Sequence, residues 1–175
     1  YAPGFAMPMF MHSMAPGGVP PTLPLANVIE FFKHESRFER VADIGRDPND
    51  VPPPITRTNS TEVKINVVVK EVISEVFPGI YFNYWTFDGT VPGPMYRVRE
   101  GDTVILSITN DQASLHHHNI DLHAVTGQGG GASLTNVMPG ETKTIKWKAI
   151  NQGLFIYHCA MPNVSTHNSH GQYGL

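Results

Sequence analysis

Two short segments of this sequence combine the residue types that bind transition metals. One reads HNIDLH over residues 118–123, and the other reads FIYHC over residues 155–159 and ends in the only cysteine of the chain. If both segments are β-strands, successive side chains point to opposite faces. His118 then shares a core face with apolar neighbours, and Cys159 lies on the core face of its own strand. The alternation therefore predicts one cluster inside the fold and a second one outside it.

The inner cluster combines a thiol with imidazoles. His167 follows Cys159 by eight residues, so a loop can return it to the neighbourhood of His118. One thiolate and two imidazoles in a plane, with a weak axial ligand, form the blue-copper electron-transfer arrangement called type 1. A lone cysteine cannot form an internal disulfide, and the alternatives to a metal ligand are a buried spectator or a nucleophile. The residue types and their order favour copper.

The outer cluster consists of Asp121, His123 and His158. Leu154 and Ile156 make the same face apolar, and a strand that is apolar on both faces should be covered on both faces. We therefore expect another domain or subunit to cover this face and to supply a third ligand if a metal binds there. Asp121 would then move protons at the metal. The alternative is a polar subunit contact without metal.

Period-two alternation of apolar residues extends over much of the chain from residue 61 onward. It is clear over residues 63–69, 104–108 and 145–149. Turns containing Gly or Pro separate such segments, a pattern typical of a β-sandwich or Greek-key barrel. The sequence therefore predicts an all-β domain over residues 61–175.

Residues 1–60 differ from the rest of the chain. Residues 1–26 are rich in Pro, Gly and Met and predict an extended arm. The methionines and His12 of this arm could bind Cu(I), although packing of the methionines against a neighbouring surface is favoured. Residues 27–44 carry apolar residues at helical spacing, which predicts one short helix. A proline-rich linker completes this part of the chain.

The bulk composition excludes several classes of protein. The chain has 12 Lys and Arg against 15 Asp and Glu, and its net charge of −3 gives no sign of a nucleic-acid partner. No apolar run approaches the roughly 18 residues that a membrane helix needs. We therefore expect a globular protein with no membrane span.

Four stretches resemble the copper-containing nitrite reductases, specifically the first cupredoxin domain of that family. They read YWTFDGTVPGPMYRVREGDTV (84–104), HNIDLHAVTGQGGGA (118–132), PGETKTIKWKA (139–149) and GLFIYHCAMPNV (153–164). The resemblance runs from about residue 61 to the end of the sequence. It implies a cupredoxin-type Greek-key β-sandwich or barrel.

For the inner cluster, the resemblance implies type 1 copper bound by His118, Cys159 and His167. Gln172 stands where the family has its axial methionine, and a glutamine oxygen can take this place, as in stellacyanin-like cupredoxins. The oxygen binds Cu(II) relatively better than a thioether does, which lowers the reduction potential. His170 is a competing axial candidate.

For the outer cluster, the resemblance implies a catalytic type 2 copper on His123 and His158, with Asp121 as the active-site aspartate. In the family, a second cupredoxin domain from a neighbouring subunit supplies the third ligand, and this chain is expected to lack that domain. The last strand of the first domain is also expected to be missing. In the strand alternation, His117 falls on the outer face, so it could in principle substitute as a ligand, although a surface role is favoured.

Two functions are expected. The first is reduction of nitrite to nitric oxide, with one electron passing from type 1 to type 2 copper. The resemblance implies a small redox protein (a cytochrome or cupredoxin) as electron donor, a homotrimer or larger assembly, and a periplasmic or otherwise extracytoplasmic location. The alternative is a single-domain blue-copper electron-transfer protein, or an electron-donating subunit without its own catalytic copper. Copper storage or delivery by the methionine-rich arm is less favoured.

Overall fold

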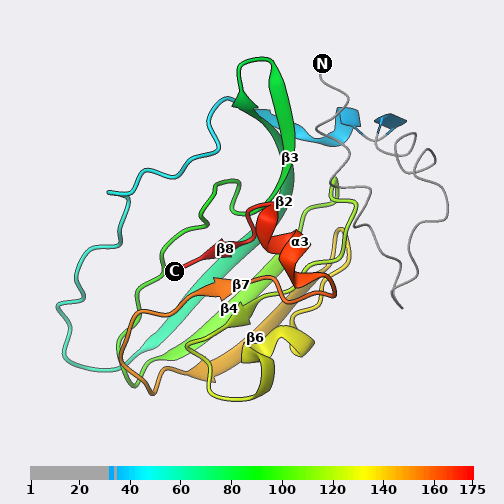
Figure 1. Ribbon diagram of the computed structural model, residues 1–175. Helices are drawn as coiled ribbons and strands as arrows, with labels where there is room; N and C mark the ends of the chain where they lie inside the picture. Colours follow the sequence, from blue (N-terminus) through cyan, green and yellow to red (C-terminus); the bar gives the residue numbers. More distant parts are fainter. Residues whose placement is uncertain (1–31, 34) are drawn as a thin grey trace.

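The regular structure of the chain is mostly β (Figure 1). The computed structural model describes residues 32, 33 and 35–175. One sheet has the order β1-β2-β4-β6, with β3 also paired to β2, and a second sheet has the order β5-β7-β8. The elements are η2 (Glu35–Arg37), β1 (Glu39–Val41), β2 (Glu62–Phe77), β3 (Ile80–Phe87), β4 (Thr103–Asn110), β5 (Asp121–Leu122), η3 (Gln128–Leu134), β6 (Thr142–Lys148), β7 (Tyr157–His158), α3 (Val164–Ser169) and β8 (Tyr173–Gly174). None of the helices in the described part is long and apolar enough to cross a membrane.

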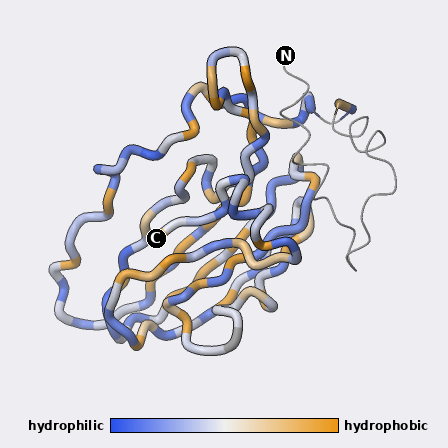
Figure 2. The backbone as a smooth tube through the Cα atoms, viewed as in Figure 1, coloured by the Kyte–Doolittle hydropathy of each residue, from blue (hydrophilic) through white to orange (hydrophobic). Residues whose placement is uncertain are grey.

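The large sheet forms where the sequence alternates between apolar and polar residues. In β4, Val104, Leu106 and Ile108 are fully buried, whereas the residues between them are partly exposed. β4 pairs in parallel with β2 and antiparallel with β6. Figure 2 shows hydrophobic and hydrophilic residues alternating along these strands. One face of the sheet therefore carries the core.

The second half of β2 departs from simple alternation. Glu71 and the three residues that follow it are all buried, so both faces of the sheet are covered here. In the antiparallel pairing with β3, Glu71 lies directly opposite Trp85. Paired residues of this kind share a face of the sheet. A carboxylate and an indole therefore enter the interior side by side.

The small sheet packs over the large one through one apolar core. Figure 1 places β7, β8 and α3 over the sheet formed by β2, β4 and β6. The core joins residues of β2, β3 and β4 to Ile120, Leu122, Val137, Tyr157 and Cys159. Two sheets that face each other across such a layer form a sandwich. The predicted all-β fold is confirmed.

Residues 173–175 extend the small sheet. β8 pairs with β7 on one side. On the other side, the amide of Gly93 donates to the carbonyl of Tyr173 at 2.8 Å, and the amide of Tyr96 donates to the carbonyl of Leu175 at 3.0 Å. These residues thus form a strand between β7 and the segment 93–96.

The helix expected over residues 27–44 is wrong from residue 35 onward. Glu35–Arg37 form a 3-10 turn, and Glu39–Val41 form β1, which pairs in parallel with β2. Pairing with the edge of β2 gives the backbone hydrogen bonds that a helix would otherwise supply, and this tertiary contact outweighs the spacing of apolar side chains. The expected arm and its methionines lie outside the described residues. The domain boundary at residue 60 stays a prediction.

Candidate metal centres

Three buried side chains from separate parts of the fold converge on one point. His118 precedes β5, Cys159 follows β7, and His167 lies in α3. A ligand atom of each lies within 4.8 Å of those of the other two. The Sγ atom of Cys159 is 3.3 Å from Nδ1 of His167. The structure thus brings together the three residues predicted for the inner cluster.

Gln172 adds a fourth donor to the inner cluster. Its Oε1 lies 2.9 Å from Nδ1 of His118 and 2.9 Å from Nδ1 of His167. Its Nε2 is buried and has no hydrogen-bond partner among the described residues. By contrast, His170 donates from Nδ1 to the carbonyl of Thr166 at 2.8 Å and is not part of the cluster. The geometry favours Gln172 over His170 as the axial donor.

Hydrogen bonds outside the side-chain cluster hold its members in place. The backbones of His118 and Val137 exchange two hydrogen bonds, of 3.1 and 2.8 Å. The amide of Cys159 donates to the carbonyl of Gln172 at 3.1 Å. Asn119 accepts a hydrogen bond from the amide that follows Cys159 at 2.7 Å, and its Oδ1 lies 3.5 Å from Sγ. The loops that carry the cluster are therefore tied to each other before any metal binds.

Burial sets the charge of the inner cluster. It raises the pKa of Cys159 to about 12. Burial, together with the nearby His118, lowers the pKa of His167 to about 3, and burial also lowers the pKa of His118. The metal-free cluster is therefore neutral at pH 7, and a metal must displace the thiol proton when it binds. A soft thiolate, two imidazole nitrogens and an amide oxygen together suit copper.

Sequence reasoning missed Glu71, which contacts the inner cluster. Its Oε1 accepts hydrogen bonds from the amides of Leu115 and His116, both at 2.8 Å, and from His116 Nδ1 at 2.9 Å. His118 Nε2 lies 3.4 Å from the same oxygen. Burial opposes ionisation of Glu71, but the two histidines hold its pKa well below the usual range. In the alternation over residues 67–73, residue 71 falls on the buried face. A charged residue at a buried position was the sequence feature that could have identified Glu71.

Trp85 was also missed. Its buried ring packs against the rings of His116 and His170, each with a centroid distance of 4.3 Å. The rings of His167 and His118 lie edge-on at 4.7 and 5.6 Å. The indole therefore supports both imidazoles of the inner cluster by direct contact.

The outer cluster forms because β5 pairs with β7. Asp121 lies opposite His158 in this pairing, and a ligand atom of each is within 4.8 Å of one another and of His123. Nε2 of His123 and Nε2 of His158 are 3.1 Å apart. His158 donates from Nδ1 to the carbonyl of Cys159 at 2.9 Å, which leaves its Nε2 as the nitrogen available to a metal. The structure thus also brings together the three residues predicted for the outer cluster.

A glycine allows the loop over residues 127–131 to approach the outer cluster. Gly130 has a φ of 49°, and a Cβ at this position would lie 2.6 Å from the backbone nitrogen and oxygen of Leu122 and closer still to Oδ1 of Asp121. Any side chain here would displace the aspartate. The glycine-rich stretch therefore lets the backbone pack directly against Asp121.

The surface around the outer cluster is apolar. Leu154 is 70% exposed and Ile156 is 47% exposed. Cover of this face by another domain or subunit stays a prediction. Among the described residues, His117 joins neither cluster.

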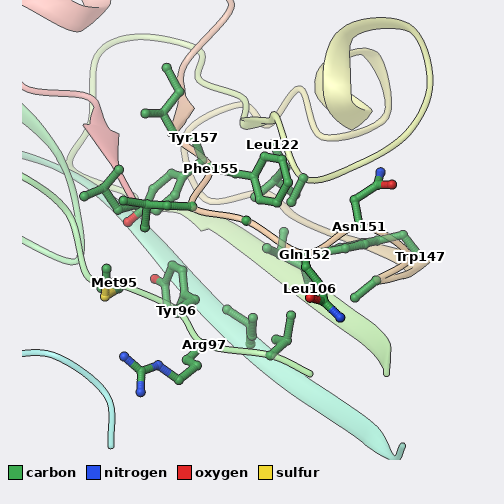
Figure 3. Close-up of a pocket in the computed structure, with 18 of the residues that line it drawn as sticks. Met95, Tyr96, Arg97, Leu106, Leu122, Trp147, Asn151, Gln152, Phe155 and Tyr157 are labelled. Atoms are coloured by element: carbon green, nitrogen blue, oxygen red, sulfur yellow. The ribbon is translucent and has the colours of Figure 1, made fainter. Parts of the chain in front are cut away.

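A separate pocket of about 350 Å³ opens between the segments 95–100 and 151–157 (Figure 3). Leu106, Leu122 and Tyr157 are among its lining residues, and no histidine or cysteine of the described part of the chain lines it. Within residues 35–175, Glu100 is its only acidic lining residue. The pocket combines apolar core residues with polar side chains such as Arg97 and Gln152, and it contains neither metal cluster.

Comparison with known proteins agrees with this geometry. A family described as multicopper oxidase matches residues 74–175. The copper-containing nitrite reductase of Neisseria meningitidis serogroup A / serotype 4A is 48% identical over 126 residues, which cover 72% of this chain and 33% of the relative. The chain thus spans about a third of the length of such relatives.

Solved structures of copper nitrite reductases also resemble this chain. The copper nitrite reductase from Nitrosomonas europaea has a TM-score of 0.59 and 36% identity, covering 65% of this chain and 40% of that chain. The copper-containing nitrite reductase from Thermus scotoductus SA-01 has a TM-score of 0.53 and 32% identity, covering 66% and 27% of the two chains. The resemblance predicted from the sequence motifs is therefore confirmed. The chain belongs to the multicopper oxidase family and is a homologue of the copper-containing nitrite reductases.

Proposed function

We propose that this chain is the type 1 copper domain of an enzyme that reduces nitrite to nitric oxide. The observation that carries the proposal is the arrangement of the two clusters, which are joined by the peptide bond between His158 and Cys159. A protein that only carries electrons has no need for Asp121 and His123 beside its redox site. The 48% identity to a nitrite reductase supports the same function.

The proposed reaction consumes one electron and two protons for each nitrite and yields nitric oxide and water. Copper would supply one-electron redox chemistry at the inner cluster and Lewis-acid activation of nitrite at the outer one. Cys159 and His158 are adjacent in the chain, so the covalent path between the clusters contains a single peptide bond. Asp121 lies within reach of both outer histidines, where its carboxyl group would relay a proton to the oxygen that leaves as water.

Several parts of the proposal extend beyond this chain. The outer cluster has two histidines, and a further domain or subunit would add the third ligand across the apolar face near Leu154 and Ile156. The family resemblance adds a homotrimer or larger assembly, a cytochrome or cupredoxin as electron donor, and a periplasmic or otherwise extracytoplasmic location.

The axial donor of the inner cluster favours a second candidate function. Gln172 offers an amide oxygen to the inner cluster in place of a thioether. This oxygen shifts the balance toward Cu(II), which suits a low-potential electron carrier or an electron-donating subunit. This second function requires only the inner cluster.

Copper counting with and without nitrite separates the two functions. The full-length protein, together with any further domain or subunit that covers the face near Leu154 and Ile156, is loaded with Cu(II), and its copper content and electron paramagnetic resonance spectrum are measured as nitrite is added. The reductase predicts a second copper whose spectrum changes with nitrite and which His158→Ala removes. It also predicts that Asp121→Asn keeps this copper but slows turnover by about 100-fold or more. One intensely coloured copper per chain with no turnover would support the electron carrier instead.

A further inference from the structure

A buried carboxylate touches the inner cluster from the side of the large sheet. Glu71 in β2 is 3% exposed, and its Oε1 is the acceptor for two backbone amides and for His116 Nδ1. The fourth contact of this oxygen is with His118 Nε2, at 3.4 Å. All four partners can donate, so an ionised carboxylate satisfies them together. Burying such a charge is costly unless donors compensate it; here all four donors lie at Oε1, and Oε2 has no hydrogen-bond partner among the described residues.

This contact determines which nitrogen of His118 carries the proton. Donation from Nε2 to Glu71 leaves Nδ1 of the neutral imidazole with a free lone pair. That Nδ1 faces Oε1 of Gln172 at 2.9 Å. Two acceptor atoms at this distance repel each other, and a cation bound between them removes the repulsion. The carboxylate therefore prepares Nδ1 to bind a cation.

We propose that Glu71 is a positioning residue for copper at the inner cluster. It holds His118 with Nδ1 toward Cys159 and Gln172, and its negative charge favours Cu(II) over Cu(I). This inference rests on copper binding by the inner cluster and does not require nitrite reduction. A carboxylate behind a ligating histidine increases the basicity of the ligand, and loss of such a partner lowers metal affinity by about 10–100-fold. Because Gln172 acts in the same direction, the two residues together lower the reduction potential.

Glu71→Gln tests the charge with little change of shape. The amide oxygen of glutamine can still accept hydrogen bonds from the backbone amides of Leu115 and His116. Its NH₂ group takes the place of Oε2, which has no hydrogen-bond partner among the described residues. Glu75→Gln is the matched control, because it removes the same charge from an exposed position of the same strand.

Redox titration of the copper-loaded chains gives the main readout. We expect Glu71→Gln to keep the thiolate-to-copper absorption band and to lose about tenfold in affinity for Cu(II) relative to Cu(I), which raises the potential by about 59 mV for one electron. Glu75→Gln should match the parent. Equal potentials for Glu71→Gln and the parent would overturn the inference. Failure of the parent chain to bind copper at all would overturn the copper-binding proposal, and this inference with it.

A second measurement needs no variant. In the metal-free chain, ¹⁵N NMR should report His118 as the neutral tautomer protonated at Nε2. A His118 protonated at Nδ1 alone would show that Glu71 does not set its orientation. This result would overturn the inference even if Glu71→Gln did not fold.

Discussion

Asp102 anchors the start of β4, and its replacement by asparagine has a cost that can be worked out from the structure. The side chain is fully buried. Oδ1 accepts hydrogen bonds from Arg57 Nη1 at 2.7 Å and the amide of Thr61 at 2.9 Å. Oδ2 accepts from Arg57 Nη2 and from the amide of Arg99. In Asp102→Asn, one oxygen becomes an NH₂ group that faces two donors, so two of the four hydrogen bonds are lost.

Each hydrogen bond to a charged group contributes about 1.5–3 kcal/mol, which gives a loss of about 3–6 kcal/mol for two. Breaking a buried ion pair by removing one partner costs about 3–5 kcal/mol. Because the side chain of Arg57 is 31% exposed, water can replace part of the interaction. We therefore expect Asp102→Asn to lower the free energy of unfolding by about 3 kcal/mol, the lower end of this range.

Urea unfolding of the metal-free chain, followed by tryptophan fluorescence, measures this loss. With a slope of about 2 kcal/mol per M, a loss of 3 kcal/mol moves the midpoint down by about 1.5 M. The control is Asp50→Asn, which removes the partner of Arg46 at a site where Asp50 is 61% exposed and should cost less than about 1 kcal/mol. If Asp102→Asn costs no more than this control at an unchanged slope, the account of the Arg57–Asp102 pair is wrong.

Three further predictions follow from individual contacts. Gly130→Ala puts a side chain into a left-handed backbone position against Asp121 and Leu122, and should lower the free energy of unfolding by about 1–3 kcal/mol; a change below the error of a urea titration would contradict the close approach. Gln172→Met replaces an oxygen donor by a thioether, so the reduction potential of the copper-loaded chain should rise in a redox titration, and a fall would argue against an axial role. The hydrogen bonds from Arg57 hold the pKa of Asp102 well below its usual range. An aspartate in the unfolded chain has a pKa of about 3.9. These hydrogen bonds therefore contribute their full stabilisation above this pH, and the stabilisation is lost as the pH falls below it. Thermal unfolding between pH 6 and pH 3 should show a smaller acid loss in Asp102→Asn than in the parent.

Both metal clusters could be predicted because they depend on a local rule. In β5, in β7 and at the residue after β7, the side chains alternate between two faces, so the identities of Asp121, His158 and Cys159 were enough to assign each to a side. The antiparallel pairing of Asp121 with His158 then closes the outer cluster. Local alternation fixed these faces, and the core on one side fixed which face points inward.

Contacts between distant parts of the chain could not be predicted in the same way. Glu71 meets His118 across 47 residues, and which strand passes behind the histidine depends on sheet order rather than on local pattern. The strand at residues 39–41 was missed for a similar reason. Its residues have helical spacing, but the edge of β2 offers hydrogen bonds that only the folded sheet provides.

Copper binding by two single-residue variants tests most directly whether neighbouring residues of β7 and its continuation serve different sites. Cys159→Ser and His158→Ala are loaded with Cu(II), and the thiolate-to-copper absorption band is compared with that of the parent. We expect Cys159→Ser to lose the band completely and His158→Ala to retain it, because Cys159 faces the buried histidines whereas His158 faces outward. Loss of the band in His158→Ala, with the fold intact, or its survival in Cys159→Ser, would contradict the assignment of the two residues to separate sites.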